Sequence, residues 1–208
     1  MDNLITYALS VFMGFFAIMN PIANTPIFLG LVEGKKAEKK KKIAKTATIT
    51  AFIIVVCFVL GGKYIFQLFG ITIPAFKITG GILIFYVGFE MLMSKTSKIH
   101  TNENLEDNDS DDGNIAVSPL AIPILAGPGT IVTAMNYVTE ANVSHVGIVI
   151  AVFGVMIVLT YFAFSLSDYI VDKVGDDMIA VIGKLMGLIL AIIGTGMVTE
   201  GIKLSYNL

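Results

Sequence analysis

The sequence predicts an all-α membrane protein with six transmembrane helices, arranged as two inverted three-helix repeats in which helices 1 and 4 are discontinuous. Three observations lead to this prediction. First, 55% of the 208 residues are apolar and only 14% are charged, and the mean hydropathy is +0.82, which is typical of an integral membrane protein. Second, a glycine pattern recurs about one hundred residues later. Third, proline-containing stretches interrupt two long apolar segments in corresponding positions.

Six apolar segments cover most of the chain, and we expect them at 4–32, 46–62, 75–94, 115–139, 146–167 and 178–204. Crossing the hydrocarbon core of a bilayer takes about 20 residues of helix. Between these segments we expect a lysine-rich loop after the first, a helix end at Gly61-Gly62 after the second, and a charged turn at 172–177.

The first repeat is predicted at 1–94 and the second at 115–208. The stretch 95–114 between them contains six acidic residues. It is too charged to be buried, and we expect it to be a polar cytoplasmic linker.

The lysines predict the orientation of the chain. All 14 basic residues are lysine, and with six spans eleven of them fall on one side, leaving only Lys63, Lys77 and Lys203 on the other. Because cytoplasmic loops carry an excess of basic residues, the lysine-rich side is expected in the cytoplasm. Both termini are then on the non-cytoplasmic side.

Two alignments indicate the internal repeat. The stretch 81–88 begins and ends with glycine around an aliphatic run, and the stretch 187–194 does the same 106 positions later. Aligning Pro21 with Pro128 gives nearly the same offset, 107. Because each half has an odd number of spans, the second half must enter the membrane inverted, and the interface of such repeats commonly holds a transporter's binding site.

The two interruptions are the predicted substrate site. The first contains Asn20, Pro21, Asn24, Thr25 and Pro26, and the second contains Pro123, Gly127, Pro128, Gly129 and Thr130. Proline removes a helix donor and disfavours helical geometry in the residue before it. We therefore expect each helix to stop and to resume near the bilayer midplane, around residues 24–25 and 129–130, with Thr130 as a helix cap.

The resumed helices predict the chemistry of the ligand. Their positive dipole ends would converge from opposite directions and favour a carboxylate, while unwound carbonyls could accept hydrogen bonds from an ammonium group. A small zwitterion of amino-acid type fits both requirements. The alternative is that both interruptions are proline kinks that only shape helix packing.

Other polar residues indicate less. Glu90 and Glu200 lie near the ends of the third and sixth segments, where they could carry a proton relay or simply lie at the membrane surface. Cys57 is the only cysteine, so no disulfide within the chain and no thiolate metal cluster is expected. The motifs of metalloproteases, serine hydrolases and nucleotide-binding enzymes do not occur. We expect neither an enzyme nor a cofactor, metal or nucleic-acid partner.

Three motifs resemble those of the MarC family, which includes the small neutral amino-acid transporters called SnatA. They are Asn20-Pro-Ile-Ala-Asn-Thr-Pro-Ile-Phe-Leu29, Pro119-Leu-Ala-Ile-Pro-Ile-Leu-Ala-Gly-Pro-Gly-Thr-Ile131 and Met186-Gly-Leu-Ile-Leu-Ala191. The resemblance extends over essentially the whole chain in length and motif order. It implies a multi-pass protein of the inner membrane, built from inverted three-helix repeats, with glycine or alanine as cargo.

The combined expectation is a secondary transporter of small neutral amino acids, working by alternating access and coupled to H+ or Na+. Three alternatives remain open: a non-transporting scaffold or regulatory protein whose glycine faces mediate homo-oligomerisation, a passive channel, and an exporter of other small solutes.

Overall fold

The computed structural model describes residues 4–93, 116–139 and 142–206, and all regular structure in these ranges is helical. The predicted linker at 95–114 lies outside the described residues. The helices are α1 (Leu4–Met19), α2 (Thr25–Leu31), α3 (Ala37–Phe69), α4 (Ile73–Met93), the π-helix η1 (Ala116–Leu125), α6 (Pro128–Val138), α7 (Val143–Ser165), α8 (Ser167–Val174) and α9 (Asp176–Tyr206).

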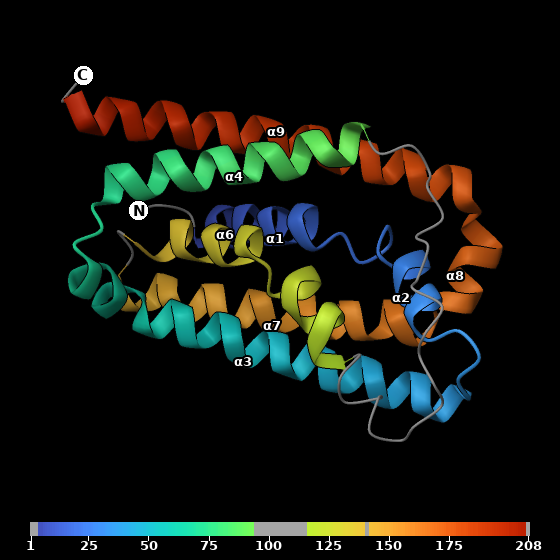
Figure 1. Ribbon diagram of the computed structural model, residues 1–208. Helices are drawn as coiled ribbons and strands as arrows, with labels where there is room; N and C mark the ends of the chain where they lie inside the picture. The colour runs from blue at the N-terminus through green and yellow to red at the C-terminus, as the bar shows by residue number, and fades with distance from the viewer. Residues whose placement is uncertain (1–3, 94–115, 140–141, 207–208) are drawn as a thin grey trace.

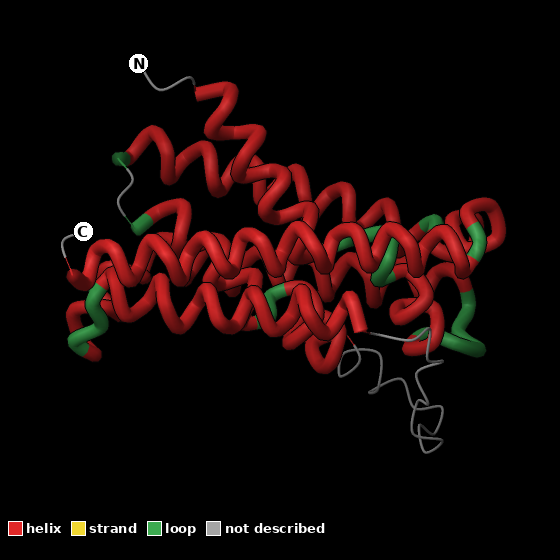
Figure 2. The backbone as a smooth tube through the Cα atoms, turned by 90° about the horizontal axis from the view of Figure 1, so that it is seen from above, coloured by secondary structure: helices red, strands yellow, loops and turns green. Residues whose placement is uncertain are grey.

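The long helices form an elongated bundle (Figures 1 and 2). Within the described ranges, four stretches are long and apolar enough to cross a membrane, namely Ala37–Gly62, Ile73–Met93, Val143–Ser165 and Asp177–Tyr206, and α1 is a shorter apolar helix. The start of α3, α2 and α8 lie at one end of the bundle, which we call the lysine-rich end. The start of α1, the end of α9 and the turn between α3 and α4 lie at the opposite end (Figure 1).

The structure corrects three predicted boundaries. Helix α3 begins at Ala37 and runs without interruption to Phe69, so most of the predicted lysine-rich loop is helical and Gly61-Gly62 does not end the helix. Lysine is a good helix former, which favours an early start of α3. At Gly62 the thioether of Met135 fills the space that a side chain would take, since a Cβ added there would overlap it. The first residues of the predicted charged turn at 172–177 belong to α8.

Glycines bring α4 and α9 into the closest helix contact in the bundle, side by side in Figure 1. A Cβ added to Gly81 would lie 2.6 Å from the carbonyl oxygen of Gly194, and one added to Gly88 would lie 2.5 Å from that of Gly187. Since the higher-numbered glycine of one helix meets the lower-numbered glycine of the other, the two helices are antiparallel. The absence of side chains allows their backbones to touch, as small residues do in membrane helix pairs.

The remaining helices surround a buried apolar core. Phe15 of α1 packs against Phe153 of α7 with ring centroids 4.8 Å apart, and Phe28 of α2 stacks on Phe164 of α7 at 4.6 Å. All four rings are buried. Helix α7 therefore packs against both α1 and α2, the two helices that flank the first interruption.

Candidate functional site

Local side-chain hydrogen bonds stabilise the chain between α1 and α2. Asn20 has a positive φ of 35°, a conformation that asparagine adopts more readily than most residues. Its Oδ1 accepts from the backbone N–H of Ala23 at 3.3 Å. The Asn24 amide donates to the carbonyl of Met19 at 2.7 Å, and the Thr25 hydroxyl donates to that of Ile22 at 2.7 Å. These bonds replace helical ones, and α2 resumes at Thr25 with a proline in its first turn.

The gap between η1 and α6 is shorter than expected. The backbone N–H of Ala126 donates to the carbonyl of Ala121 at 2.8 Å, which closes the last wide turn of η1. Pro123 was predicted within the interruption but belongs to η1, because a π-helix tolerates the missing donor and the bulk of a proline ring. Gly127 has extended geometry, φ −69° and ψ 170°, and α6 begins at Pro128.

Thr130 is not the cap of α6. The N-cap position is Gly127, which makes no side-chain capping bond, and Thr130 is the third residue of the helix. The cause is Pro128, whose fixed φ suits the first helical position and starts the helix two residues earlier than expected. The Thr130 side chain is buried instead.

The fold brings the two interruptions together. A Cβ added to Gly129, just after the second, would lie 2.8 Å from Cδ1 of Ile18, just before the first. Asn20, Pro21, Thr25, Gly127, Gly129 and Thr130 are buried, Asn24 and Pro26 are partly buried, and Pro128 is exposed. The side chain of Pro123 lies outside the described part of the structure.

Two residues at or one turn from these interruptions, Asn20 and Thr133, have a buried polar atom without a partner. Among the described residues, the buried side-chain atoms that accept or donate no hydrogen bond within the protein are Asn20 Nδ2, Thr133 Oγ1, Asn136 Oδ1 and Ser165 Oγ. Thr133 lies one turn beyond Gly129 on α6. Leaving such an atom unpaired costs about 1–3 kcal/mol, so a small polar ligand or water would be stabilised here. Thr133 and Asn136 are not among the site residues predicted from the sequence, although two polar residues three positions apart in an apolar segment could have indicated them.

The two candidate proton carriers have different surroundings. Glu90 is exposed on α4. Glu200 of α9 forms an ion pair with Lys77 of α4. The Lys77 side chain is only 6% exposed and that of Glu200 is 53% exposed. Lys77 contributes only to the orientation predicted from the sequence, although a basic residue within an apolar segment was a signal for its buried position.

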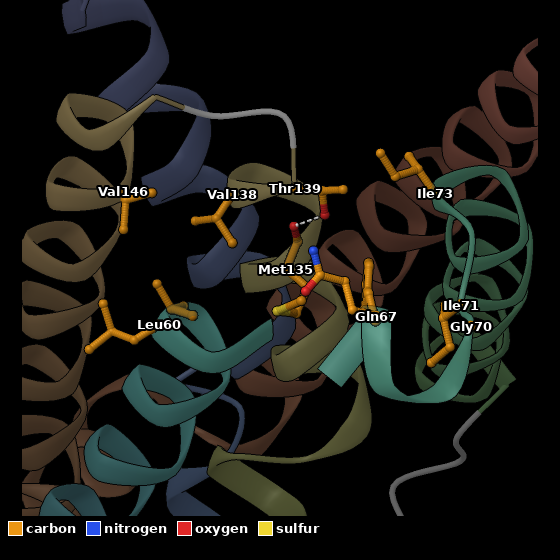
Figure 3. A pocket seen from close by; sticks show the side chains of 11 residues that line it. Leu60, Gln67, Gly70, Ile71, Ile73, Met135, Val138, Thr139 and Val146 are labelled. Atoms are coloured by element: carbon orange, nitrogen blue, oxygen red, sulfur yellow. Dashed lines mark hydrogen bonds between the residues drawn. The ribbon is translucent and has the colours of Figure 1, made fainter. Parts of the chain in front are cut away.

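A cavity of about 610 Å³ lies at the end of the bundle opposite the lysine-rich end. It is lined by the end of α3, the end of α6, the start of α7 and the turn before α4 (Figure 3). Most of its lining is apolar, as in Leu60, Val138 and Val146, and Gln67 and Thr139 add polar groups. Figure 3 shows Gln67 of α3 and Met135 of α6 among the side chains that line the cavity.

The fold and the composition define a multi-helix integral membrane protein with an apolar core and two helix interruptions among its buried residues. Comparison with known proteins makes the assignment specific: a profile of MarC family integral membrane proteins matches residues 5–206. The chain belongs to the MarC family.

Similar proteins occur in bacteria and archaea. The chain is 41% identical to the UPF0056 membrane protein YvbG of Bacillus subtilis over 202 residues, 95% of each chain. It is 36% identical to a UPF0056 membrane protein of Pyrococcus abyssi over the full length of both chains. It is 34% identical to the UPF0056 membrane protein MJ1677 of Methanocaldococcus jannaschii, over 95% of this chain and 96% of that one. No solved structure matches.

Proposed function

We propose that this protein is a secondary transporter of small neutral amino acids, glycine and alanine, which binds its substrate between two discontinuous helices. The observation that carries the proposal is the contact between Ile18 and Gly129, which joins the two interruptions. Together they form one buried region with free polar atoms. Backbone that is not helical is tolerated at membrane depth only where it is buried in protein or lines a water-filled cavity.

Matching helix boundaries support six spans in two inverted repeats. The helix before the interruption ends at Met19 in the first half and at Leu125 in the second. The helix that follows the interrupted span begins at Ala37 in the first half, as α3, and at Val143 in the second half, as α7. Both pairs are 106 positions apart, the offset of the glycine pattern. In this arrangement α1 and α2 form the first span and η1 and α6 form the fourth.

The contacts between α4 and α9 have the same symmetry. A shift of 106 positions relates Gly81 to Gly187 and Gly88 to Gly194, so it converts the contact of Gly81 with Gly194 into that of Gly187 with Gly88. The side chains that a Cβ would meet obey the same rule: these are Met197 at Gly81 and Met91 at Gly187. A two-fold axis in the membrane plane produces this pattern, and it is the symmetry of inverted repeats.

The chemistry of the region favours a small zwitterion. The Asn20 amide and the backbone N–H groups at the start of α6 are donors for a carboxylate. Thr133 Oγ1 and Asn136 Oδ1 are acceptors for an ammonium group. The missing side chain of Gly129 lets α6 pack closely against Ile18 of α1, and this tight contact favours a ligand with a small side chain.

The lysine distribution supports an orientation in the inner membrane with the lysine-rich end in the cytoplasm and both termini on the other side. Coupling to H+ or Na+ is proposed as the energy source. Glu90 of α4 and Glu200 of α9 are the proposed proton carriers.

Uptake of labelled glycine and alanine into proteoliposomes tests the proposal, with a proton or a sodium gradient imposed in separate experiments. Saturable flux that depends on one gradient is expected. Absence of saturable flux for any amino acid would refute it and favour a scaffold or regulatory protein. Flux of other small solutes alone would make the protein an exporter of a different class.

A narrower experiment tests the site. Asn20→Ala and Thr130→Ala are expected to lower transport while protein level holds, because both side chains are buried beside the interruptions. Thr195→Ala is the matched control, since Thr195 is exposed on α9 and its hydroxyl donates only to its own helix, to Ala191. Unchanged transport in the first two variants would show that the interruptions are packing kinks.

A further inference from the structure

We propose that the last turns of α3 and the equivalent helix α8 are the two gates of the transport path, and that Lys40 and Asp168 hold the α8 gate closed in this conformation. We call residues 61–69 the α3 arm and α8 (Ser167–Val174) the α8 arm. The inference rests on the proposed transport function and its inverted repeat, and it names the parts that would alternate.

The two arms occupy equivalent positions in the two halves. Helix α7 is interrupted at Leu166, where φ is −108° and ψ is 17°, and the position 106 residues earlier is Leu60 of α3. The α8 arm therefore corresponds to the α3 arm. Both end at a glycine with positive φ, Gly70 with 63° and Gly175 with 81°.

The surroundings of the arms differ although their positions correspond. The α8 arm packs against α2 (Figure 1). The equivalent of α2 in the second half is the last part of α6, and the cavity of about 610 Å³ lies between this part and the α3 arm, with Met135 and Gln67 on its two walls (Figure 3). The protein is thus packed at the lysine-rich end and open at the opposite end. Two equivalent halves in unequal conformations are what alternating access between two ends requires.

An ion pair holds the closed arm. Lys40 Nζ of α3 lies 3.1 Å from Oδ1 and 3.3 Å from Oδ2 of Asp168, at the start of the α8 arm. The positions equivalent to these two residues are Val146 and Gly62. They have no charges, so the open arm lacks this interaction. The pair is available in only one of the two conformations that the repeat permits.

Glycine gives the α3 arm a place to bend. A Cβ added to Gly61 would meet no atom within 4 Å, so packing in this conformation does not require glycine there. Glycine inside a helix weakens it. Gly61 and Gly62 lie at the junction that is equivalent to the interruption between α7 and α8. Gly62 already contacts Met135 of α6, so bending at this junction would move the later residues of the α3 arm toward α6 and close the cavity.

Thiol labelling in lipid nanodiscs tests the proposal without any substrate. Cys57 is exposed and is first replaced by alanine. Gln67→Cys then reports on the cavity, and Ser165→Cys reports on the lysine-rich end, because Ser165 is the equivalent of the cavity residue Val59. A water-soluble methanethiosulfonate is the probe. Gln67→Cys is expected to react faster than Ser165→Cys.

Lys40→Ala is expected to raise the labelling rate of Ser165→Cys and to lower that of Gln67→Cys, each about two- to fivefold, the range for a partly exposed ion pair. The charge exchange Lys40→Asp with Asp168→Lys is expected to restore both rates. Lys41→Ala removes an exposed lysine one position along α3 and is expected to change neither. Thermal unfolding of each variant confirms that it is folded.

A reciprocal change supports two alternating gates. If Ser165→Cys reacts faster while Gln67→Cys is unchanged, the α8 arm merely frays, and the proposal is overturned. It is also overturned if Ser165→Cys is unaffected or if the charge exchange fails to restore the rates. Because labelling needs no amino acid, reciprocal labelling without flux would disprove only the transport function, and flux without reciprocal labelling would disprove only the gates.

Discussion

The close contact of α4 and α9 predicts that alanine substitutions at two glycines of α9 will have different effects on thermal stability. A Cβ added to Gly194 would lie 2.5 Å from the carbonyl oxygen of Gly81 and 2.5 Å from the backbone nitrogen of Phe85. A Cβ added to Gly196, two residues later on α9, would meet no atom within 4 Å. Gly194→Ala and Gly196→Ala are therefore the same chemical change with opposite steric consequences.

The magnitude follows from the distances. Ordinary van der Waals contact begins at 3.4 Å, so Gly194→Ala must separate the two helices by about 1 Å, because backbone atoms cannot move aside as a side chain can. Overpacking of this kind costs roughly 1–3 kcal/mol. Gly196→Ala avoids this cost and gains up to about 1 kcal/mol of helix propensity. At roughly 2–4 °C per kcal/mol, the Tm should fall by about 2–12 °C in the first variant and rise slightly in the second.

Thermal unfolding in one detergent measures this difference. The chain has no tryptophan, so loss of helix is followed by circular dichroism at 222 nm, a helix-sensitive signal. Equal Tm values for the two variants would refute the reasoning, because the backbones of α4 and α9 would then not touch at Gly194. The contacts between α4 and α9 would then no longer support an inverted repeat.

Three further predictions concern other parts of the chain. Glu200→Gln is expected to lower the Tm more than Lys77→Met does, because it leaves the buried ammonium of Lys77 without its carboxylate. The loss in free energy of unfolding should be smaller than the roughly 3–5 kcal/mol of a fully buried pair, since Glu200 is half exposed. The reverse order would contradict the burial of Lys77. Gly61→Ala is expected to raise the free energy of unfolding by up to about 1 kcal/mol through helix propensity, and therefore to raise the Tm slightly. It is also expected to slow transport several-fold, whereas Gly196→Ala should leave transport unchanged. Equal transport in both variants would argue against a bend at Gly61. Gly129→Ala would place a methyl group 2.8 Å from the flexible end of Ile18, so protein level should hold while glycine flux falls; unaltered flux would exclude the substrate from this region.

The predicted helix interruptions agree with the structure where local chemistry decides the backbone. Asn20 with its positive φ, the side-chain bonds of Asn24 and Thr25, and the start of α2 all follow from residues within six positions of one another. Gly127 and Pro128 likewise determine where α6 begins. Thr130 was misassigned as a cap because the sequence offers several possible starts for this helix, and Pro128, whose fixed φ suits the first helical position, determines which of them is used.

The hydropathy, the two interruptions and the glycine pattern follow from the sequence by itself, because solvation of side chains in hydrocarbon and the geometry of proline and glycine are properties of single residues. Only the tertiary structure decided where those features meet. Gly61-Gly62 remains inside α3 because Met135 fills the space beside Gly62. Lys77 is buried because Glu200 lies opposite it, 123 positions away, and Lys40 reaches Asp168 across 128 positions. Such contacts depend on how helices pack against one another, and no local pattern encodes the distance between residues so far apart in the chain.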